Sequence, residues 1–568
     1  MPQDLEGRAC SRRLLLSGII LATVTSGGLG SPAAHAQTAP DLSIIDRRVK
    51  EGEKTPPRRI PVPVPRIEGA APPAAAMQPF TLSGVIIEGA TVFKPADFTK
   101  TYEKYLATRV GDPEIEAILR GITQRYDDEG YFLARAIAPA QDITTGILRI
   151  RVIEGTITKF TPAGDYPYPK LLAKYAQPVL GEHPARLPTV ERVLLLMSDL
   201  PGVTVKPRLK PLNAEAGEYE LIADVDYRPV RAFGRLDNRG TPDVGRLQGW
   251  LGAGLNGVLG FGESINATFV TVPNQPKELL YGSLSGTLPV GHNGAYVSLY
   301  GAQGAIDAGG NSAQFDTNST STQAIGRAGY PLMRSRAQNL WINGTFDYRD
   351  FHQTQFDQTT IEDRLRVLRG GLSYNLNDRF DGESQAGVEV SEGLGIMGAS
   401  KAGSNTLSRT DGHSQFTKIS ANAARLQKIT RHVSVRVAAA GQWSADPLLA
   451  YEQFSLGGEY FGRGYDYGER TGDDGVAGSG EIRYGSEMNW RWLSEYQFYG
   501  FYDIGAVWNK SSADGPSSDH LSSAGGGLRL RLNDSVRAGL EAAKPLDQRV
   551  DSTGDRDWRV FFTLIANY

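Results

Sequence analysis

Two residues of opposite charge stand out among those whose types could do chemistry. Arg463 lies in the glycine-rich run Phe461-Gly462-Arg463-Gly464-Tyr465, and Asp503 lies further along in Phe501-Tyr502-Asp503-Ile504-Gly505. A guanidinium and a carboxylate can form a two-pronged ion pair, a geometry that suits the anchoring of a loop. Taken alone, Arg463 reads as a solvated loop charge. Whether the two residues meet depends on the elements that carry them.

Other candidate sites are weak. The run Gly393-Leu394-Gly395-Ile396-Met397-Gly398 has dinucleotide-binding spacing, but it neither follows a buried parallel strand nor opens a helix. The seven histidines are scattered without metal-ligand spacing. No lysine-containing phosphate loop occurs, and the only cysteine is Cys10. The sequence therefore predicts no catalytic residue, no cofactor and no metal site, and so no enzyme.

The first 36 residues predict a cleaved export signal. Three arginines precede a short apolar core from Leu14 to Ala22, and Ala34-His35-Ala36 supplies small residues at the cleavage positions. A membrane anchor is the alternative, but the apolar core soon breaks into Thr, Ser and Gly. Beyond this segment no apolar run is long enough for a transmembrane helix.

The next two segments read as a short helix and a linker. Within residues 37–54, Leu42, Ile45 and Val49 have the spacing of a helix. Residues 55–79 are rich in proline and alanine, which predicts a semi-rigid, extended linker without a core of its own.

Two similar α+β modules follow, over residues 80–155 and 156–229. Each reads as a strand, helices and two further strands, so the order β-α-α-β-β occurs twice. In the first module, Asp112 and Pro113 predict the N-cap and first turn of a helix that Gly130 ends. In the second module we expect strands at Val203–Leu209 and Tyr219–Val225.

From residue 230 to 568 the pattern changes to 16 segments of alternating apolar and small or polar residues. Short connections alternate with long polar ones, and the longest runs from Ser444 to Ala477. An even strand count with loops sorted by length is typical of an outer-membrane β-barrel. A soluble all-β enzyme has no reason to sort its loops in this way.

Strand periodicity assigns faces to two of these segments. Tyr502 and Ile504 fall on an apolar face that suits lipid, so Asp503 must point into the lumen, because a lipid-facing carboxylate is costly. In the last strand Trp558, Phe562, Leu564 and Tyr568 share one face. We expect this strand to close against the first one, with that face as its signal to the barrel-assembly machinery.

At this point the chain resembles two-partner secretion transporters, the outer-membrane pores that export hemolysin- and hemagglutinin-like proteins. The run Leu236-Asp237-Asn238-Arg239-Gly240 and the run around Arg463 carry the resemblance. It implies two polypeptide-transport-associated (POTRA) modules in the periplasm and an all-β transmembrane barrel of 16 antiparallel strands. It also implies that the arginine loop folds into the lumen and pairs with Asp503. Gly462 stands where the family usually has an aliphatic residue, so we expect slightly weaker loop packing.

The resemblance implies a pore for one large secreted partner protein, recognised by the POTRA modules, in an outer membrane whose lipids surround the barrel. No nucleic-acid partner is expected. Residues 41–54 would be either a plug in the resting pore or a disordered tail. The alternative function is a barrel-assembly insertase of the same superfamily, although such proteins usually carry three or more POTRA modules. We expect the second module to hold the recognition site, by addition of the partner as a strand.

Overall fold

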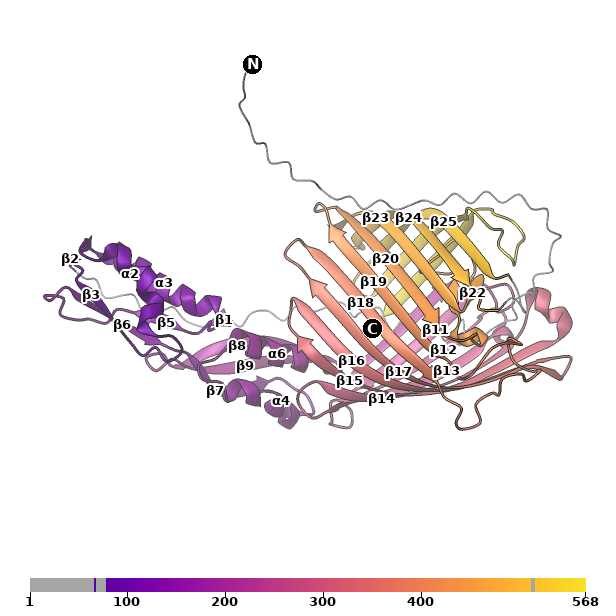
Figure 1. Cartoon of the computed structure of the whole chain (residues 1–568), viewed down its shortest axis with the longest axis horizontal. Coiled ribbons are helices and arrows are strands. Elements are labelled where there is room, and N and C mark those ends of the chain that lie inside the picture. The colour runs from indigo at the N-terminus through magenta and orange to yellow at the C-terminus, as the bar shows by residue number, and fades with distance from the viewer. Residues whose placement is uncertain (1–47, 49–65, 68–77, 512–515) are drawn as a thin grey trace, which may run out of the picture. The chain divides into compact units, whose positions relative to one another are not determined.

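The protein consists of two α+β modules followed by a barrel, as a computed structural model shows (Figure 1). It describes residues 48, 66–67, 78–511 and 516–568. The export signal, the linker except residues 66–67 and 78–79, and all of the short predicted helix except Arg48 lie outside these residues. The predicted fold class is confirmed, because 16 antiparallel strands form a closed barrel.

The first module has a three-stranded sheet in the order β3-β6-β5, with β3 parallel to β6. Its long helix α3 (Asp112–Asp128) packs its apolar face on this sheet, and Gly130 follows at φ +88°. The predicted N-cap is wrong by one residue. Gly111 is the cap, because its amide donates to Glu114 Oε2 at 2.8 Å, and Asp112 is already helical.

The first of the two strands expected after α3 is short and covers only Arg135–Ile137, and three short helical elements precede α3. The remaining elements of this module are β2 (Phe80–Thr81), β3 (Gly84–Glu88), η1 (Pro95–Phe98), α2 (Thr99–Tyr102), η2 (Glu103–Tyr105), β4 (Arg109–Val110), β5 (Arg135–Ile137) and β6 (Ile147–Ile153).

The second module has a four-stranded sheet in the order β1-β8-β9-β7. The strand β1 (Arg66–Ile67) comes from the linker and pairs in parallel with β8, so the linker occupies the outer edge of that strand. The other elements are β7 (Thr156–Ala163), α4 (Pro169–Tyr175), α5 (Gln177–Leu180), α6 (Leu187–Ser198), β8 (Val203–Asn213) and β9 (Glu218–Tyr227).

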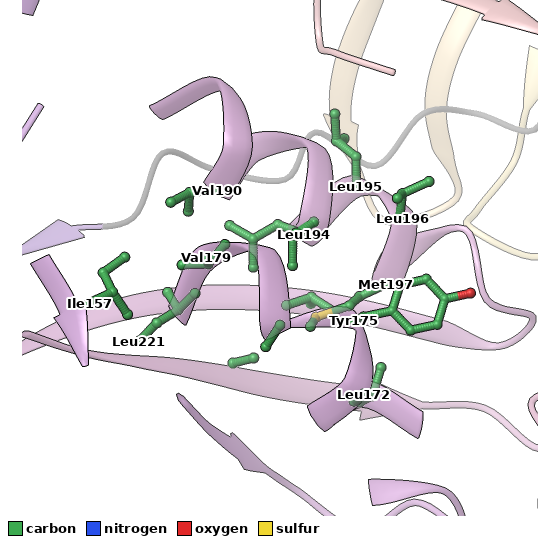
Figure 2. Close-up of a cluster of buried hydrophobic side chains, with 14 of the residues drawn as sticks. Ile157, Leu172, Tyr175, Val179, Val190, Leu194, Leu195, Leu196, Met197 and Leu221 are labelled. Carbon is green, nitrogen blue, oxygen red and sulfur yellow. The ribbon is translucent and has the colours of Figure 1, made fainter. Parts of the chain in front are cut away.

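The helix α6 covers one face of this sheet. Figure 2 shows Leu194 directed toward Val179, with Ile157 and Leu221 of the sheet beneath them. Val190, Leu194 and Met197 are fully buried, each at 0% exposure. These apolar residues close the core of the module itself, so the sheet edges rather than this helix face remain for an extended peptide.

The barrel begins at Val230, and two residues separate it from the end of β9. Its strands are β10 (Val230–Asp237), β11 (Gln248–Asn256), β12 (Ser264–Thr271), β13 (Leu280–Val290), β14 (Ala295–Asp307), β15 (Thr317–Arg334), β16 (Gln338–Gln355), β17 (Gln358–Asn377), β18 (Gly382–Gly393), β19 (Thr417–Lys428), β20 (Val433–Ser444), β23 (Asp474–Trp490), β24 (Leu493–Trp508), β25 (Ser518–Arg531), β26 (Val536–Pro545) and β27 (Arg559–Asn567). Short turns join alternate pairs and longer loops join the others, except that β16 and β17, where a longer loop was expected, are joined by Phe356 and Asp357 alone. Two of the longer loops contain η3 (Pro276–Glu278) and η4 (Gly310–Phe315).

The ring closes between β10 and β27, as expected. Five residue pairs form this joint, from Phe233–Asn567 to Asp237–Thr563. The ladder between β15 and β16 is much longer and extends from Thr317 to Arg334. Among the helices that the structure describes, none has the length and apolar character needed to cross a membrane.

Candidate functional site

The loop of residues 445–473, between β20 and β23, carries Arg463. It contains η5 (Ala450–Glu452) and a small hairpin of β21 (Phe454–Leu456) and β22 (Arg470–Gly472). In β24, Tyr502 and Ile504 are exposed on the outer face, while Asp503 between them is 0% exposed. The alternation places Asp503 on the inner wall of the barrel, and the structure brings Arg463 against it.

Arg463 and Asp503 form a two-pronged ion pair inside the barrel. Arg463 Nε donates to Asp503 Oδ2 at 2.9 Å and Nη2 to Oδ1 at 2.8 Å. The guanidinium also lies over the ring of Phe501, 3.5 Å from its centroid. Arg463 is only 5% exposed, so the alternative of a solvated loop charge does not describe this side chain.

The glycines on both sides of Arg463 allow the loop to approach the wall. Gly462 has φ +91°, and a Cβ there would lie 2.6 Å from Leu521 Cδ1. Its amide donates to Asp503 Oδ2 at 3.2 Å. An aliphatic residue would clash here, so in this chain glycine does not weaken the packing at position 462. A Cβ on Gly464 would lie 2.8 Å from the backbone nitrogen of Pro545, so this turn also packs closely.

Tyr465 completes the contact on the side of β26. Its side chain is buried at 2% exposure, and its hydroxyl donates to the carbonyl of Gln548 at 3.2 Å. The same hydroxyl accepts the amide of Gln548 at 3.1 Å. The loop tip is therefore tied both to the inner wall and to the loop that follows β26.

Two further wall residues hold Arg463, and the sequence reasoning missed both. Glu481 Oε2 accepts Nη1 at 2.6 Å, and Ser479 Oγ accepts Nη2 at 3.0 Å. Both lie on β23, the neighbour of β24. Glu481 sits between Gly480 and the exposed Ile482, so strand alternation applied to this segment would have placed it in the lumen.

A second charged contact joins Arg48 to the barrel wall. Arg48 is the one described residue of the predicted plug segment, and it is helical. Its Nη2 donates to Asp237 Oδ1 at 2.9 Å and Oδ2 at 3.0 Å, and Nη1 contacts Gln248 Oε1. The guanidinium lies 5.1 Å from the centroid of Trp250 and 5.0 Å from that of Tyr467 in the long loop. Wall, loop and N-terminal segment therefore meet at one place.

The neighbours of Asp237 give its sequence run a structural explanation. Asn238 Nδ2 donates to the carbonyl of Val560 at 3.0 Å, and Asn238 Oδ1 accepts the amide of Phe562 at 2.8 Å. This side chain thus continues the joint between β10 and β27 beyond the last strand pair. Arg239 points inward and its Nη2 lies 2.6 Å from Glu541 Oε1.

The last strand presents its predicted face outward. Trp558 and Leu564 are exposed there, at 60% and 44%, and Phe562 is partly buried. The backbone of Tyr568 still pairs with Ala232 of β10, with its amide 2.9 Å from the carbonyl. The seal of the barrel therefore includes the terminal residue.

The described residues contain no cluster of metal ligands. No group of three or more His, Cys, Asp or Glu side chains in these residues could hold a metal ion. The glycine run of residues 393–398 leaves the end of β18 and enters the loop before β19, without a helix after it.

Comparison with known proteins assigns the family. The POTRA domain of ShlB type matches residues 80–155. The outer membrane transporter CdiB of Escherichia coli is 24% identical over 493 residues, which cover 82% of this chain and 79% of that protein. The hemolysin transporter protein ShlB of Serratia marcescens is 25% identical, covering 72% of this chain and 73% of the relative.

The fold agrees with these matches. The solved structure of CdiB from Escherichia coli superposes with a TM-score of 0.71 at 20% identity, covering 94% of this chain and all of that one. The haemolysin secretion/activation family ShlB/FhaC/HecB matches residues 221–530, more than half of the chain. The chain therefore belongs to the haemolysin secretion/activation protein family.

Proposed function

We propose that the barrel exports one secreted partner protein through a lumen that two movable elements close at rest. Membership of the family makes the chain an outer-membrane transporter of two-partner secretion, with POTRA modules in the periplasm. One observation carries the further proposal. The lumen is crossed by the arginine loop, which ionic contacts hold, and Arg48 of the N-terminal segment contacts the same loop.

The charges around Arg48 connect the two elements. The carboxylate of Asp237 forms an ion pair with the guanidinium of Arg48. The guanidinium of Arg235 lies 2.8 Å from Asp237 and 3.0 Å from Glu459 of the loop. Ion pairs in a wet lumen exchange more readily than a packed apolar core, because water competes for each partner. We propose that the segment of residues 41–54 acts as a plug that Arg48 holds, and that Arg463 and Asp503 hold the loop.

The partner would first bind in the periplasm by strand addition to the second module. Strand β9, which contains the expected strand Tyr219–Val225, lies between β7 and β8 and so has no free edge. The outer edge of β8 accepts a strand, and β1 occupies it. An extended segment of the partner would therefore compete with the linker for this edge.

Cross-linking tests this proposal during export of a secreted partner protein. Single cysteines are introduced at Lys206 or Lys210, which are exposed on β8. A cysteine at Asp226, which is exposed on β9, is the matched control. We expect the partner to cross-link to the two β8 positions and not to Asp226→Cys. Cross-links only to lumen positions would place recognition outside this module.

The same cells distinguish the insertase alternative. If the chain inserted other barrels, its depletion would lower the amounts of many outer-membrane proteins and affect the secreted partner no more than the rest. We propose further that bilayer lipids contact the exposed apolar face and that the assembly machinery reads the face of Trp558, Phe562, Leu564 and Tyr568. Substitution of this face should lower the amount of inserted barrel.

A further inference from the structure

A second charged cluster contacts the long loop on another part of the barrel wall. Glu452, in η5 on the first arm of the loop, is 1% exposed. Its Oε1 accepts Arg369 Nη2 at 2.6 Å, and its Oε2 lies 2.7 Å from Lys418 Nζ. Arg369 belongs to β17 and Lys418 to β19. Two wall strands therefore hold one carboxylate of the loop.

The backbone of Glu452 is held as well as its side chain. Lys418 Nζ donates to the carbonyl oxygen of Glu452 at 2.8 Å, and Gln442 Nε2 donates to the same oxygen at 3.0 Å. Because both the backbone and the side chain of Glu452 are bound, the contact fixes the position of the arm as well as neutralising its charge. The base of the loop is tied separately, because Asp473 Oδ1 accepts the amide of Leu448 at 2.8 Å.

Two of the charged contacts of the loop, those of Arg463 and Glu452, have opposite polarity. At the tip, the loop supplies Arg463 and the wall supplies Asp503 and Glu481. At the arm, the loop supplies a carboxylate and the wall supplies two cations. The strands concerned are β23 and β24 in the first case and β17 and β19 in the second. No described side chain is shared by the two groups of direct ion-pair partners.

We propose that Glu452 is a second, independent anchor, so that release of Arg463 loosens the turn of residues 461–465 while the arm stays on the wall. Removal of Glu452 would leave Arg369 and Lys418 close together, with Asp347 at 3.5 Å from Arg369 as a nearby carboxylate. Buried cations without a matching charge are strongly unfavourable. Glu452 is thus a positioning residue for the loop.

Two buried serines of the wall can report each anchor separately. Ser523 is 0% exposed, and the Cβ that Gly464 lacks would lie 3.0 Å from its Cβ, so the tip covers it. Ser391 is also 0% exposed, and its Oγ accepts Arg369 Nη1 at 2.9 Å. Ser523→Cys and Ser391→Cys change one atom each, and the described residues contain no other cysteine.

The experiment measures the rate at which a maleimide reagent labels each cysteine in the full chain, purified in detergent without any exported protein. Arg463→Ala should raise labelling of Ser523→Cys on the order of tenfold and leave Ser391→Cys within about twofold, as expected when local openings are independent. Glu452→Gln should do the reverse. Glu392→Gln is the matched control, because this exposed residue of β18 is next to Ser391 and accepts a hydrogen bond from the hydroxyl of Thr417.

A third variant separates the effect of lost charge from that of lost packing. It also keeps the test valid if Glu452→Gln alone fails to fold. Glu452→Gln with Lys418→Gln removes one charge of each sign, and we expect it to recover part of the protection of Ser391→Cys. The proposal is overturned if Arg463→Ala exposes both reporters equally, if Glu452→Gln leaves Ser391→Cys protected, or if the double variant recovers nothing. The proposal rests on the loop as a movable closure, but this readout needs no partner, so a failure of export would not be mistaken for its failure.

Discussion

Arg463 and Asp503 are joined through both the side chain and the backbone of the arginine. Nη2 of Arg463 lies 2.8 Å from Asp503 Oδ1, and the amide of Arg463 donates to Oδ2 of the same carboxylate at 3.0 Å. The contact therefore fixes the turn of the loop as well as the position of its charge. A change to either residue should disturb both.

The first prediction concerns this pair. Arg463→Ala leaves Asp503 in the wall without its main partner, a loss of ~3–5 kcal/mol in a dry interior and less in a wet lumen. We expect the barrel to insert and export of the partner to fall on the order of tenfold. Secreted and cell-bound partner are compared by immunoblot. Arg364→Ala, which removes a half-exposed arginine paired with Glu362, is the control. Unchanged secretion by Arg463→Ala would contradict the role of the pair.

Exchange of the two charges should restore only part of the export. In Arg463→Asp with Asp503→Arg, the new carboxylate at position 463 would face Glu481, whose Oε2 now lies 2.6 Å from the guanidinium. Like charges at this distance repel each other. Addition of Glu481→Gln to the exchanged pair should therefore raise secretion further. A full recovery without that third change would show that Glu481 contributes little.

The second prediction concerns the proposed plug. Arg48→Ala removes the bidentate contact with Asp237 and the two aromatic contacts, so the segment should leave the lumen more often. In planar bilayers we expect a larger fraction of open channels at rest, and the effect should resemble that of high salt, which screens the same pair. Identical conductance traces for Arg48→Ala and the unchanged protein would exclude a plug held by this residue.

The third prediction concerns pH. Burial, together with the charges of Asp551 and Asp466, raises the pKa of Glu469 in the loop to about 7. The docked loop then keeps a proton that a solvent-exposed glutamate releases near 4.5. Docking against the loop of residues 546–558 should therefore be strongest below pH 4.5 and weaken as the pH rises to about 7.

Channel recordings between pH 4.5 and pH 8 test this dependence. We expect the open fraction to increase with pH up to about 7 and then level off. Glu469→Gln, which cannot ionise, should abolish the slope in this window. A slope of the same size in Glu469→Gln would assign the titration to another group.

The fourth prediction concerns the joint of the barrel. A closed barrel keeps its ladder in detergent until heated, so the protein should migrate differently on a gel before and after boiling. Asn238→Leu removes two hydrogen bonds that extend the joint, each worth roughly 1 kcal/mol. We expect the unfolding temperature in this gel assay to fall. Asn318→Leu, at a partly exposed position near the start of β15, serves as the control and should leave this temperature unchanged.

The sequence predicted the barrel well because its main signals are local. Alternation along a strand and the length of each loop are set within a few residues, so the strand count and the inward direction of Asp503 could be read directly. The interactions between distant segments could not. Glu452 and Arg369 are far apart in sequence, and neither lies in a recognisable run, so only the folded loop brings them together.

The misplaced features have local causes as well. Gly111 caps α3 because its amide reaches Glu114, whereas the sequence pattern favoured the side chain of Asp112. The edge of β8 looked open because the pattern of the linker gave no sign that Arg66 and Ile67 would form a strand. A two-residue strand is too short to show any periodicity.

Because the hydrogen-bond ladder between β10 and β27 is short, the barrel opens more easily at this joint than between its other strands. Every strand has two neighbours, but the five pairs of this joint contrast with the long register of β15 and β16. Local openings follow the least stable contacts, so amide exchange within the wall should begin at Phe233–Asp237 and Thr563–Asn567. For local unfolding, the closed barrel therefore behaves as a long twisted sheet whose first and last strands are joined by its shortest hydrogen-bond ladder.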